Sequence, residues 1–181
     1  MGRFFGYLRD KKQDLLINVF KDLYDKESIK NWSLHLAGSA SLGDEGYIKE
    51  LKELAKDYPI NFYPNLDYDD LMHLYGESSI YWHASGFNET DPTKMEHFGI
   101  AVVEAMAAGC VPVIISKGGL KEIVEERVSG LFWEDLDDLK KQTLELINDK
   151  KLQLKISKEA INKSISFNRG RFEKAILELI Q

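Results

Sequence analysis

The sequence predicts an α/β fold in which helices cover both faces of a parallel sheet. Apolar residues alternate between strand-like and helix-like spacing along the chain to about residue 133. The strand-like segments are separated by segments long enough for a helix, which is the order of a doubly wound, Rossmann-like sheet. Residues 111–115 (VPVII) are apolar throughout, as in a strand that is buried on both faces.

The first half of the chain is predicted to alternate helices and strands. Apolar residues three or four apart, such as Leu16, Val19 and Leu23, indicate a helix with one buried face. Short apolar runs that end at Gly38 or begin after Pro59 indicate strands. The expected order is helix 15–23, strand 32–37, helix 47–55, strand 60–63, helix 67–75 and strand 79–84.

The second half continues the alternation and ends in helices. A polar segment at 85–95, interrupted by Pro92, is predicted to be a loop. Gly118 and Gly119 are predicted to precede a helix that ends near residue 126. The other elements expected are helix 100–108, strand 111–115, strand 130–133 and helices 136–147, 152–164 and 171–180.

Composition restricts the class of protein and its partners. The chain has 181 residues, of which 44% are hydrophobic, and this is enough for one well-buried core. No apolar run approaches the roughly 20 residues that span a bilayer, and we expect no signal peptide. The net charge of −6 disfavours nucleic acid as a partner. The lone Cys110 excludes an internal disulfide and favours a cytoplasmic setting, with peripheral membrane association left open for a full-length protein.

The predicted topology locates a ligand site before any motif is considered. In doubly wound sheets, ligands bind beyond the carboxyl ends of the strands, at the point where the strand order reverses. Here those ends are followed by turns at Gly38, Asn65, 85–99 and 116–119. We find no internal repeat and no second domain, so we expect one wall of this crevice to come from outside the chain.

Residues 96–109 (EHFGIAVVEAMAAG) contain the most informative pattern. A helix that begins near Phe98 would offer unpaired N–H groups and its positive end to a diphosphate. Gly99 would let that ligand approach the backbone closely. Glu104 would then lie within reach of a ribose and Glu96 would face a sugar, because carboxylates accept hydrogen bonds from hydroxyl groups. The alternatives are that Glu104 belongs to a solvated helix face and that Glu96 caps the helix.

This stretch resembles the E-x7-E signature of the retaining glycosyltransferases of family 4, which have the two-domain GT-B fold. The family pattern is close to E-x-F-G-[IL]-x-x-x-E-A-[ML]-A-x-G-x-P-V. The matching positions are Glu96, Phe98, Gly99, Ile100, Glu104, Ala105, Met106, Ala107, Gly109, Pro112 and Val113, the last two displaced by one residue. The form Glu-His-Phe-Gly-Ile at 96–100 is similar to mannosyltransferases that build lipid-linked oligosaccharides.

The resemblance implies a domain and a reaction. Residues 1–181 would be the C-terminal, nucleotide-sugar-binding half of a GT-B fold, with the N-terminal acceptor domain outside this chain. The full-length protein would transfer a sugar, mannose or another hexose, from a nucleoside diphosphate sugar to a glycan or lipid-linked acceptor. No metal and no cofactor would be needed. The chain alone would bind the donor and remain inactive.

The same resemblance implies roles for individual residues. Gly2-Arg3-Phe4 and Lys11, followed by 14–17 (DLLI), are similar to the opening of the family's domain. Arg3 and Lys11 would clamp the diphosphate as its charge grows, although Arg9 or Lys12 could take the place of Lys11. Ordinary surface charge is the alternative for both. The expected donor contacts are Gly38, His97, Phe98, Gly99, Ile100 and Glu104, and the expected catalytic residues are Glu96, Arg3 and Lys11.

Other classes remain open or are disfavoured. A nucleotide-sugar epimerase with this fold and a non-catalytic nucleotide-binding module are the alternatives to a transferase. A dehydrogenase is disfavoured because no G-x-G-x-x-G follows the first strand. Glu89, Asp91 and Glu96 share one loop but offer too few convergent oxygens for a hard cation. His35, His73 and His83 lack a common ligand spacing and are expected to be core or loop residues.

Overall fold

The structure, a computed structural model, describes residues 3–4, 6, 9–26 and 29–179. Gly2, part of the opening motif, lies outside the described residues. The strands are β1 (Leu34–Gly38), β2 (Ile60–Pro64), β3 (Ile80–His83), β4 (Val111–Ile115) and β5 (Leu131–Trp133). The helices are α1 (Gln13–Lys26), α2 (Glu45–Leu54), α3 (Tyr68–Glu77), α4 (Ile100–Ala107), α5 (Leu120–Ile123), α6 (Leu136–Asn148), α7 (Lys150–Ser164) and α8 (Arg169–Leu179). Short 3-10 turns lie at Leu42–Asp44, Pro92–Lys94 and Ile165–Phe167.

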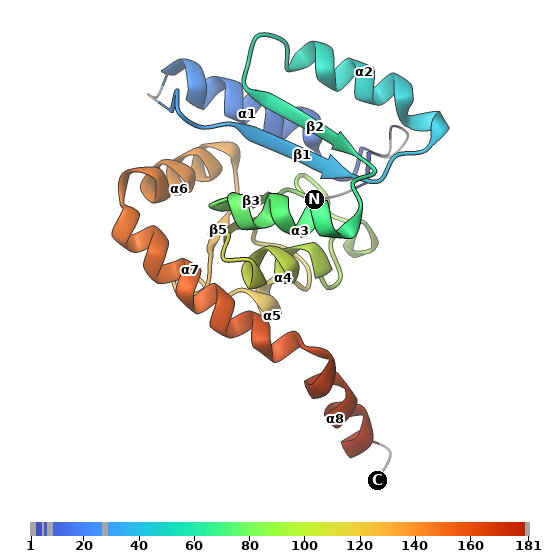
Figure 1. Cartoon of the computed structure of the whole chain (residues 1–181), viewed down its shortest axis with the longest axis vertical. Coiled ribbons are helices and arrows are strands. Elements are labelled where there is room, and N and C mark those ends of the chain that lie inside the picture. The colour runs from blue at the N-terminus through green and yellow to red at the C-terminus, as the bar shows by residue number, and fades with distance from the viewer. Residues whose placement is uncertain (1–2, 5, 7–8, 27–28, 180–181) are drawn as a thin grey trace.

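All strand pairs are parallel, which confirms the predicted α/β class. β1 pairs with β2, and β4 lies between β3 and β5. Helix α1 packs against β1, α2 and α6, while α4 packs against β3, β4 and α7 (Figure 1). One feature differs from the expected continuous sheet: β1 and β3 are not hydrogen-bonded to each other, so the strands form two sheets.

The core has two parts that follow this division. The larger part surrounds β4, whose five residues are all buried, as their unbroken apolar run predicts. The smaller part lies between β1, α1 and α2 and contains Phe4, Ile17, Leu36 and Leu51. Leu34 and Ile60 border both parts, so the two regions share apolar contacts.

Side-chain caps explain where several helices begin. Asp67, Asp135 and Asp149 each accept a backbone N–H from the first turn of α3, α6 and α7, respectively. Helix α4 begins at Ile100 instead of near Phe98, because Gly99 at its N-cap adopts φ 92°, outside the helical range. This start agrees with the expected helix 100–108, whereas the alternative start near Phe98 is wrong by two residues.

Other boundaries also differ from the sequence-based expectation: α1, α2, α7 and α8 each begin two residues earlier than expected. β1 begins at Leu34 because Trp32 closes a turn, donating its N–H to Ile29 O at 2.9 Å. Helix α5 ends at Ile123, and a turn follows in which the Ser129 hydroxyl accepts the N–H of Glu125.

At the C-terminal end of the chain, α8 extends away from the body (Figure 1). Within the described ranges, no helix is long and apolar enough to cross a membrane.

Candidate functional site

The turns that follow β1 and β2 are tied to each other at the carboxyl edge. Asn65 donates its backbone N–H to Gly38 O at 2.9 Å. Its side chain accepts the Ala40 N–H at 2.8 Å and donates to Ala40 O at 3.0 Å. Asn65 has φ 58°, a left-handed conformation that asparagine adopts more readily than most residues. The turn at Gly38 is thereby fixed in position.

The N-terminal segment is fastened to this turn. Phe4 is buried and donates its N–H to Ser39 O at 2.8 Å. The Gln13 side chain donates to Arg3 O at 3.0 Å and accepts from the Tyr47 hydroxyl at 3.2 Å. These bonds place the backbone of Arg3 beside the end of β1, with its side chain exposed.

Glu96 lies at the centre of the candidate site and has two partners. Lys11 Nζ is 3.0 Å from Glu96 Oε2, and His83 Nε2 is 3.5 Å from the same oxygen. The hydrogen bond from His83 and the ammonium of Lys11 lower the pKa of Glu96 to about 2, although partial burial opposes this. The carboxylate is therefore ionised at neutral pH. Two residues 85 positions apart, both chosen from the sequence, lie in direct contact.

Arg9 and Lys12, the basic neighbours of Lys11, have other partners. They therefore do not take the place of Lys11 in the contact with Glu96. Lys12 Nζ is 3.1 Å from Glu89 Oε1, and Arg9 pairs with Glu50 at 2.7 Å. Lys117 donates to the backbone oxygen of Glu89 at 2.8 Å, which fastens the 85–95 loop to the end of β4. Lys11 is thus the basic residue of this segment that meets Glu96.

Gly118 and Gly119 allow the loop that contains Glu96 to lie close to the turn after β4. The Gly119 N–H donates to Glu96 O at 3.0 Å. A Cβ at Gly118 would lie 2.3 Å from Glu96 O, and a Cβ at Gly119 would lie 1.9 Å from His97 O. Since the Gly119 amide is already bonded to the loop, its role here is to hold Glu96, and it is not free to bind a donor.

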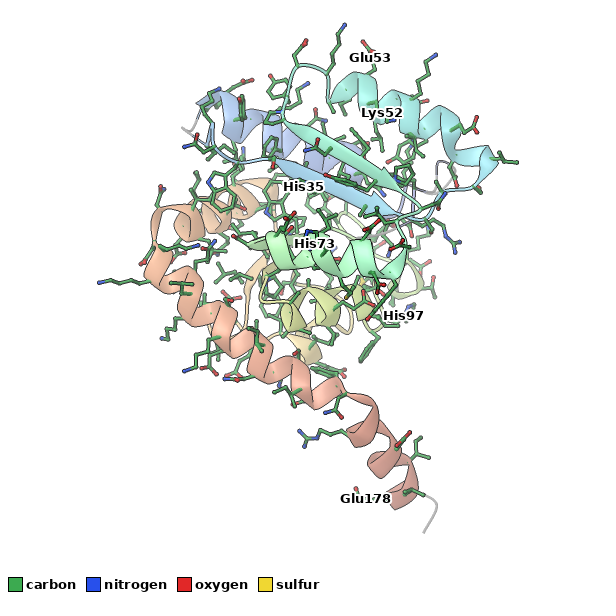
Figure 2. All side chains as sticks on the ribbon, viewed as in Figure 1. His35, Lys52, Glu53, His73, His97 and Glu178 are labelled. Atoms are coloured by element: carbon green, nitrogen blue, oxygen red, sulfur yellow. The ribbon has the colours of Figure 1, made fainter. Side chains whose placement is uncertain are left out.

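The start of α4 faces the same crevice. Gly99 is tightly enclosed, because a Cβ there would lie 2.6 Å from the Leu120 side chain. His97, Phe98 and Ile100 are exposed around it, and Figure 2 shows His97 at the surface. The N-cap position is occupied by Gly99, and the contacts described for the Glu96 carboxylate are with Lys11 and His83, which favours the site role over a helix cap.

Glu104 lies in the second turn of α4 and is partly buried. Its Oε2 is buried and has no hydrogen-bond partner among the described residues. Burial raises the pKa of this carboxyl group, an effect that the nearby Tyr75 hydroxyl opposes. A glutamate on a solvated helix face would show neither feature, so the arrangement favours a carboxylate that awaits a hydrogen-bond donor.

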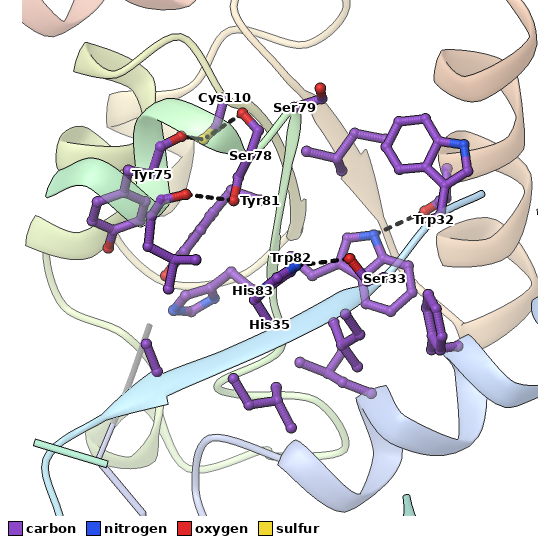
Figure 3. A pocket seen from close by; sticks show the side chains of 18 of the residues that line it. Trp32, Ser33, His35, Tyr75, Ser78, Ser79, Tyr81, Trp82, His83 and Cys110 are labelled. Atoms are coloured by element: carbon purple, nitrogen blue, oxygen red, sulfur yellow. Dashed lines mark hydrogen bonds between the residues drawn. The ribbon is translucent and has the colours of Figure 1, made fainter. Parts of the chain in front are cut away.

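A cavity of about 520 Å³ separates the two sheets (Figure 3). Its lining comes from α1, β1, α3 and β3, and includes Lys11, His83 and Ser85 at the carboxyl edge. The Ser85 hydroxyl is buried without a partner among the described residues. The cavity therefore extends to the candidate site at the carboxyl edge. In folds of this kind, ligands bind at this edge, where the strand order reverses.

His83 is the site residue that the sequence did not indicate. It was expected to be a core or loop histidine, and it is indeed 6% exposed, but its Nε2 faces Glu96. The preceding Trp82 donates to the Thr143 hydroxyl at 2.9 Å. The position of His83 in the sequence could have indicated its role, because His83 is the last residue of β3, as Gly38 is of β1.

The remaining candidates for metal binding do not converge. His35 stacks on Tyr63, and His73 pairs with Glu77 on α3. In the part of the chain that the structure describes, no three His, Cys, Asp or Glu side chains group as metal ligands would. Metal independence stays a prediction.

Comparison with known proteins identifies the family. A family model described as glycosyl transferases group 1 matches residues 3–163. The chain belongs to this family. The chain has the fold of a solved C-terminal domain of a group 1 family glycosyl transferase from Francisella tularensis, with a TM-score of 0.73, 24% identity, and 92% and 82% of the two chains covered. The predicted glycosyltransferase family and the predicted α/β fold are thus confirmed.

Relatives of this glycosyltransferase domain include mannosyltransferases. It is 29% identical over 188 residues to the human GDP-Man:Man(3)GlcNAc(2)-PP-Dol alpha-1,2-mannosyltransferase, covering 95% of this chain and 36% of the relative. The Mus musculus protein of the same name is 30% identical, with 93% and 35% covered. The structure of Anabaena HepE in complex with UDP has a TM-score of 0.78, 25% identity, and 99% and 47% covered. The chain spans about a third of the length of these curated relatives.

Proposed function

We propose that residues 1–181 are the donor-binding domain of a retaining glycosyltransferase. Its reaction moves a hexose from a nucleoside diphosphate sugar to a glycan or lipid-linked acceptor. The names of the mannosyltransferase relatives favour mannose as the sugar and guanosine as the nucleoside. The UDP bound to the Anabaena relative supports a nucleoside diphosphate as the ligand.

The observation that carries the proposal is the contact between Lys11 and Glu96, 3.0 Å apart at the carboxyl edge. In the proposed reaction Lys11 and Arg3 stabilise the negative charge that grows on the departing diphosphate. Glu96 orients the sugar and stabilises the positive charge that develops at its anomeric carbon. A cation and a carboxylate this close match a donor whose two halves acquire opposite charge as their bond breaks.

The proposed contacts with the phosphate and ribose of the donor lie at the start of α4. The amides of the first turn of α4, together with the close approach at Gly99, suit a phosphate group. Glu104 accepts hydrogen bonds from the ribose hydroxyls through the oxygen that has no partner among the described side chains. Gly38 and residues 97–100 complete the contacts, and the proposed binding uses no metal.

An acceptor domain outside this chain completes the crevice in our proposal. The relatives are about three times longer than the stretch that this chain matches. A two-domain arrangement would also cover Phe98 and Ile100, which are 48% and 66% exposed at the crevice. Acceptor specificity then resides in that other domain.

A donor panel tests the proposal. Thermal unfolding of the 181-residue chain is measured with GDP, UDP and ADP and with GDP-mannose, UDP-glucose and ADP-glucose, each with and without EDTA. We expect at least one nucleotide sugar to raise the melting temperature more than its bare nucleotide does, with no effect of EDTA. Identical melting temperatures with and without every ligand would contradict the proposal.

Two other functions are distinguished from the transferase by different measurements. An epimerase half also binds the donor, so the products of a longer polypeptide must separate it from a transferase. A non-catalytic module binds nucleotide, but Glu96→Ala then leaves the additional stabilisation by the sugar unchanged. The placement of Glu96 beside Lys11 favours the transferase, because a module that only binds nucleotide has no use for a carboxylate that faces a sugar.

A further inference from the structure

His83 combines deep burial with an incomplete set of hydrogen bonds. Its side chain is 6% exposed at the end of β3, and its Nε2 lies 3.5 Å from Glu96 Oε2. Its other ring nitrogen, Nδ1, is buried and has no hydrogen-bond partner within the described ranges. A buried histidine with a single polar neighbour is unusual, because buried polar groups are generally paired.

We propose that His83 is a positioning residue whose neutral imidazole, protonated on Nε2, fixes the carboxylate of Glu96 toward the donor sugar. This inference rests on the proposed function, because it assumes that Glu96 faces the sugar. It assigns to the end of β3 a role in the site that the signature at 96–109 does not include.

The tautomer follows from the partners. A carboxylate only accepts hydrogen bonds, so the ring nitrogen that faces Glu96 must donate. Nδ1 has no partner among the described residues that would favour a proton there. Burial and the nearby Lys11 ammonium keep the pKa of His83 low, although Glu96 opposes this, and the ring therefore has one N–H.

Rigidity explains why a second partner is useful beside Lys11. Glu96 lies in an irregular loop, whereas His83 ends a strand that is hydrogen-bonded to β4. Lys11 has a long, flexible stem, and its ammonium is also needed at the diphosphate. When Lys11 turns toward the diphosphate, His83 remains as a fixed donor that keeps the carboxylate in place.

Calorimetry on the 181-residue chain tests the role toward the sugar. The quantity measured is the ratio of the Kd for the bare nucleotide to the Kd for its nucleotide sugar, using the pair that binds best among GDP and GDP-mannose, UDP and UDP-glucose, and ADP and ADP-glucose. We expect His83→Leu to lower this ratio on the order of tenfold, or to unity where the ratio itself is smaller. We expect His83→Gln, which keeps an N–H at a similar reach, to restore it.

A double-mutant cycle and a stability control separate positioning from a structural role. In the Glu96→Ala background, His83→Leu should cause no further change in the ratio. Thr143→Val removes the buried hydrogen bond to Trp82, next to His83, without touching a proposed site residue. It should lower the melting temperature and leave the ratio unchanged. If His83→Leu keeps the wild-type ratio while Glu96→Ala lowers it, the inference is wrong and the proposed function still holds.

A measurement without ligand tests the contact itself. Long-range 1H–15N spectra of the histidine rings should show His83 protonated on Nε2. A proton on Nδ1 would overturn the inference. Because the spectra are recorded on the wild-type chain, this test also applies if His83→Leu fails to fold. If no nucleotide sugar binds the wild-type chain, the proposed function fails and so does the role toward the sugar, while the spectra still decide whether His83 donates to Glu96.

Discussion

Glu96 and Glu104, eight residues apart, have opposite electrostatic environments. Lys11 and His83 stabilise the ionised form of Glu96, whereas burial disfavours the ionised form of Glu104. The first environment suits a carboxylate that must stay charged while a positive charge develops beside it. The second suits one that gains its hydrogen bonds only when a ligand arrives. Their spacing is common by chance, so these environments, and not the spacing, distinguish the two residues.

Glu104→Gln should weaken nucleotide binding and stabilise the free domain. Loss of hydrogen bonds from the ribose to a charged acceptor should reduce the binding free energy by about 1.5–3 kcal/mol, equally for nucleotide and nucleotide sugar. Because burial raises the pKa of Glu104 above 4.5, the folded state loses stability as this group ionises with rising pH. The glutamine variant lacks that loss, so it should melt at a higher temperature at pH 7.

Calorimetry and thermal unfolding at pH 7 and pH 4 measure both effects. The difference in melting temperature should shrink at pH 4, where Glu104 is protonated in the folded and unfolded states. Unchanged nucleotide affinity in Glu104→Gln would rule out the ribose contact, whatever happens to the stability.

Glu96→Gln should show the opposite dependence on pH. The pKa of Glu96 falls from 4.5 to about 2 on folding, so the group contributes stability above pH 4.5 that is lost as the pH falls toward 2. The variant should be less stable than the wild type at pH 7, and the difference should narrow between pH 4.5 and pH 2. Denaturant unfolding across this range measures it, and a constant difference would mean that the contacts with Lys11 and His83 do not form in solution.

Sequence reasoning located Glu96, Lys11 and Glu104 but not His83. The first three belong to patterns with a recognisable spacing, and the structure brings Lys11 and Glu96 into contact. His83 belongs to no such pattern, since its partner is thirteen residues away across a loop. The contact depends on how that loop folds back to Gly118 and Gly119, and residue spacing does not specify that path.

At the scale of elements, the position of Glu96 depends on the turn between β4 and α5. Gly119→Ala would bring a methyl group to within 1.9 Å of His97 O, so the loop must move. We expect a loss of about 1–3 kcal/mol in stability, as for overpacked sites. We also expect donor affinity to lose its sugar-dependent part, because Glu96 O is bonded to the same residue. Thermal unfolding and calorimetry with nucleotide and nucleotide sugar check both.

Gly76→Ala is the matched control for this prediction. Gly76 lies in α3, and a Cβ there would meet nothing within 4 Å. Alanine has the higher helix propensity, so this variant should be more stable by about 0.5–1 kcal/mol and bind the donor as the wild type does. Equal behaviour of the two variants would show that the close approach at Gly119 does not hold the loop.

The elements themselves were predictable where local chemistry specifies them. The buried run of β4 and the aspartates at 67, 135 and 149 act within a few residues, and the strand and helices begin there within two residues of the expected positions. The separation of β1 from β3 was not predictable, because pairing between strands more than 40 residues apart depends on how whole layers pack. The start of α4 at Ile100 agrees with the expected helix 100–108, and the alternative start near Phe98 failed because Gly99, confined by Leu120 from another helix, adopts a left-handed φ.

At the scale of the whole molecule, one complete core adjoins an exposed crevice. The two parts of the core enclose large apolar side chains such as Trp133, Leu51 and Ile17 with almost no exposure, which predicts that the chain folds by itself. Phe98 and Ile100 remain exposed at the start of α4, and α8 extends away from the body (Figure 1). These features agree with the proposed function, in which this unit binds the donor and another domain binds the acceptor.

The 181-residue chain should therefore bind a nucleotide sugar and transfer no sugar. Transfer requires an acceptor hydroxyl held in line with the anomeric carbon, and such positioning contributes about 7–11 kcal/mol to catalysis. The chain holds Glu96 and Lys11 together, but in our proposal the groups that would hold the acceptor belong to another domain. Mass spectrometry of reactions with GDP-mannose or UDP-glucose and a glycan or lipid-linked acceptor should show no product. A polypeptide that also contains the acceptor domain should form product, and Glu96→Ala in it should lower turnover more than donor binding. Robust transfer by the 181-residue chain alone would show that the acceptor site lies within these residues, and the two-domain proposal would be wrong.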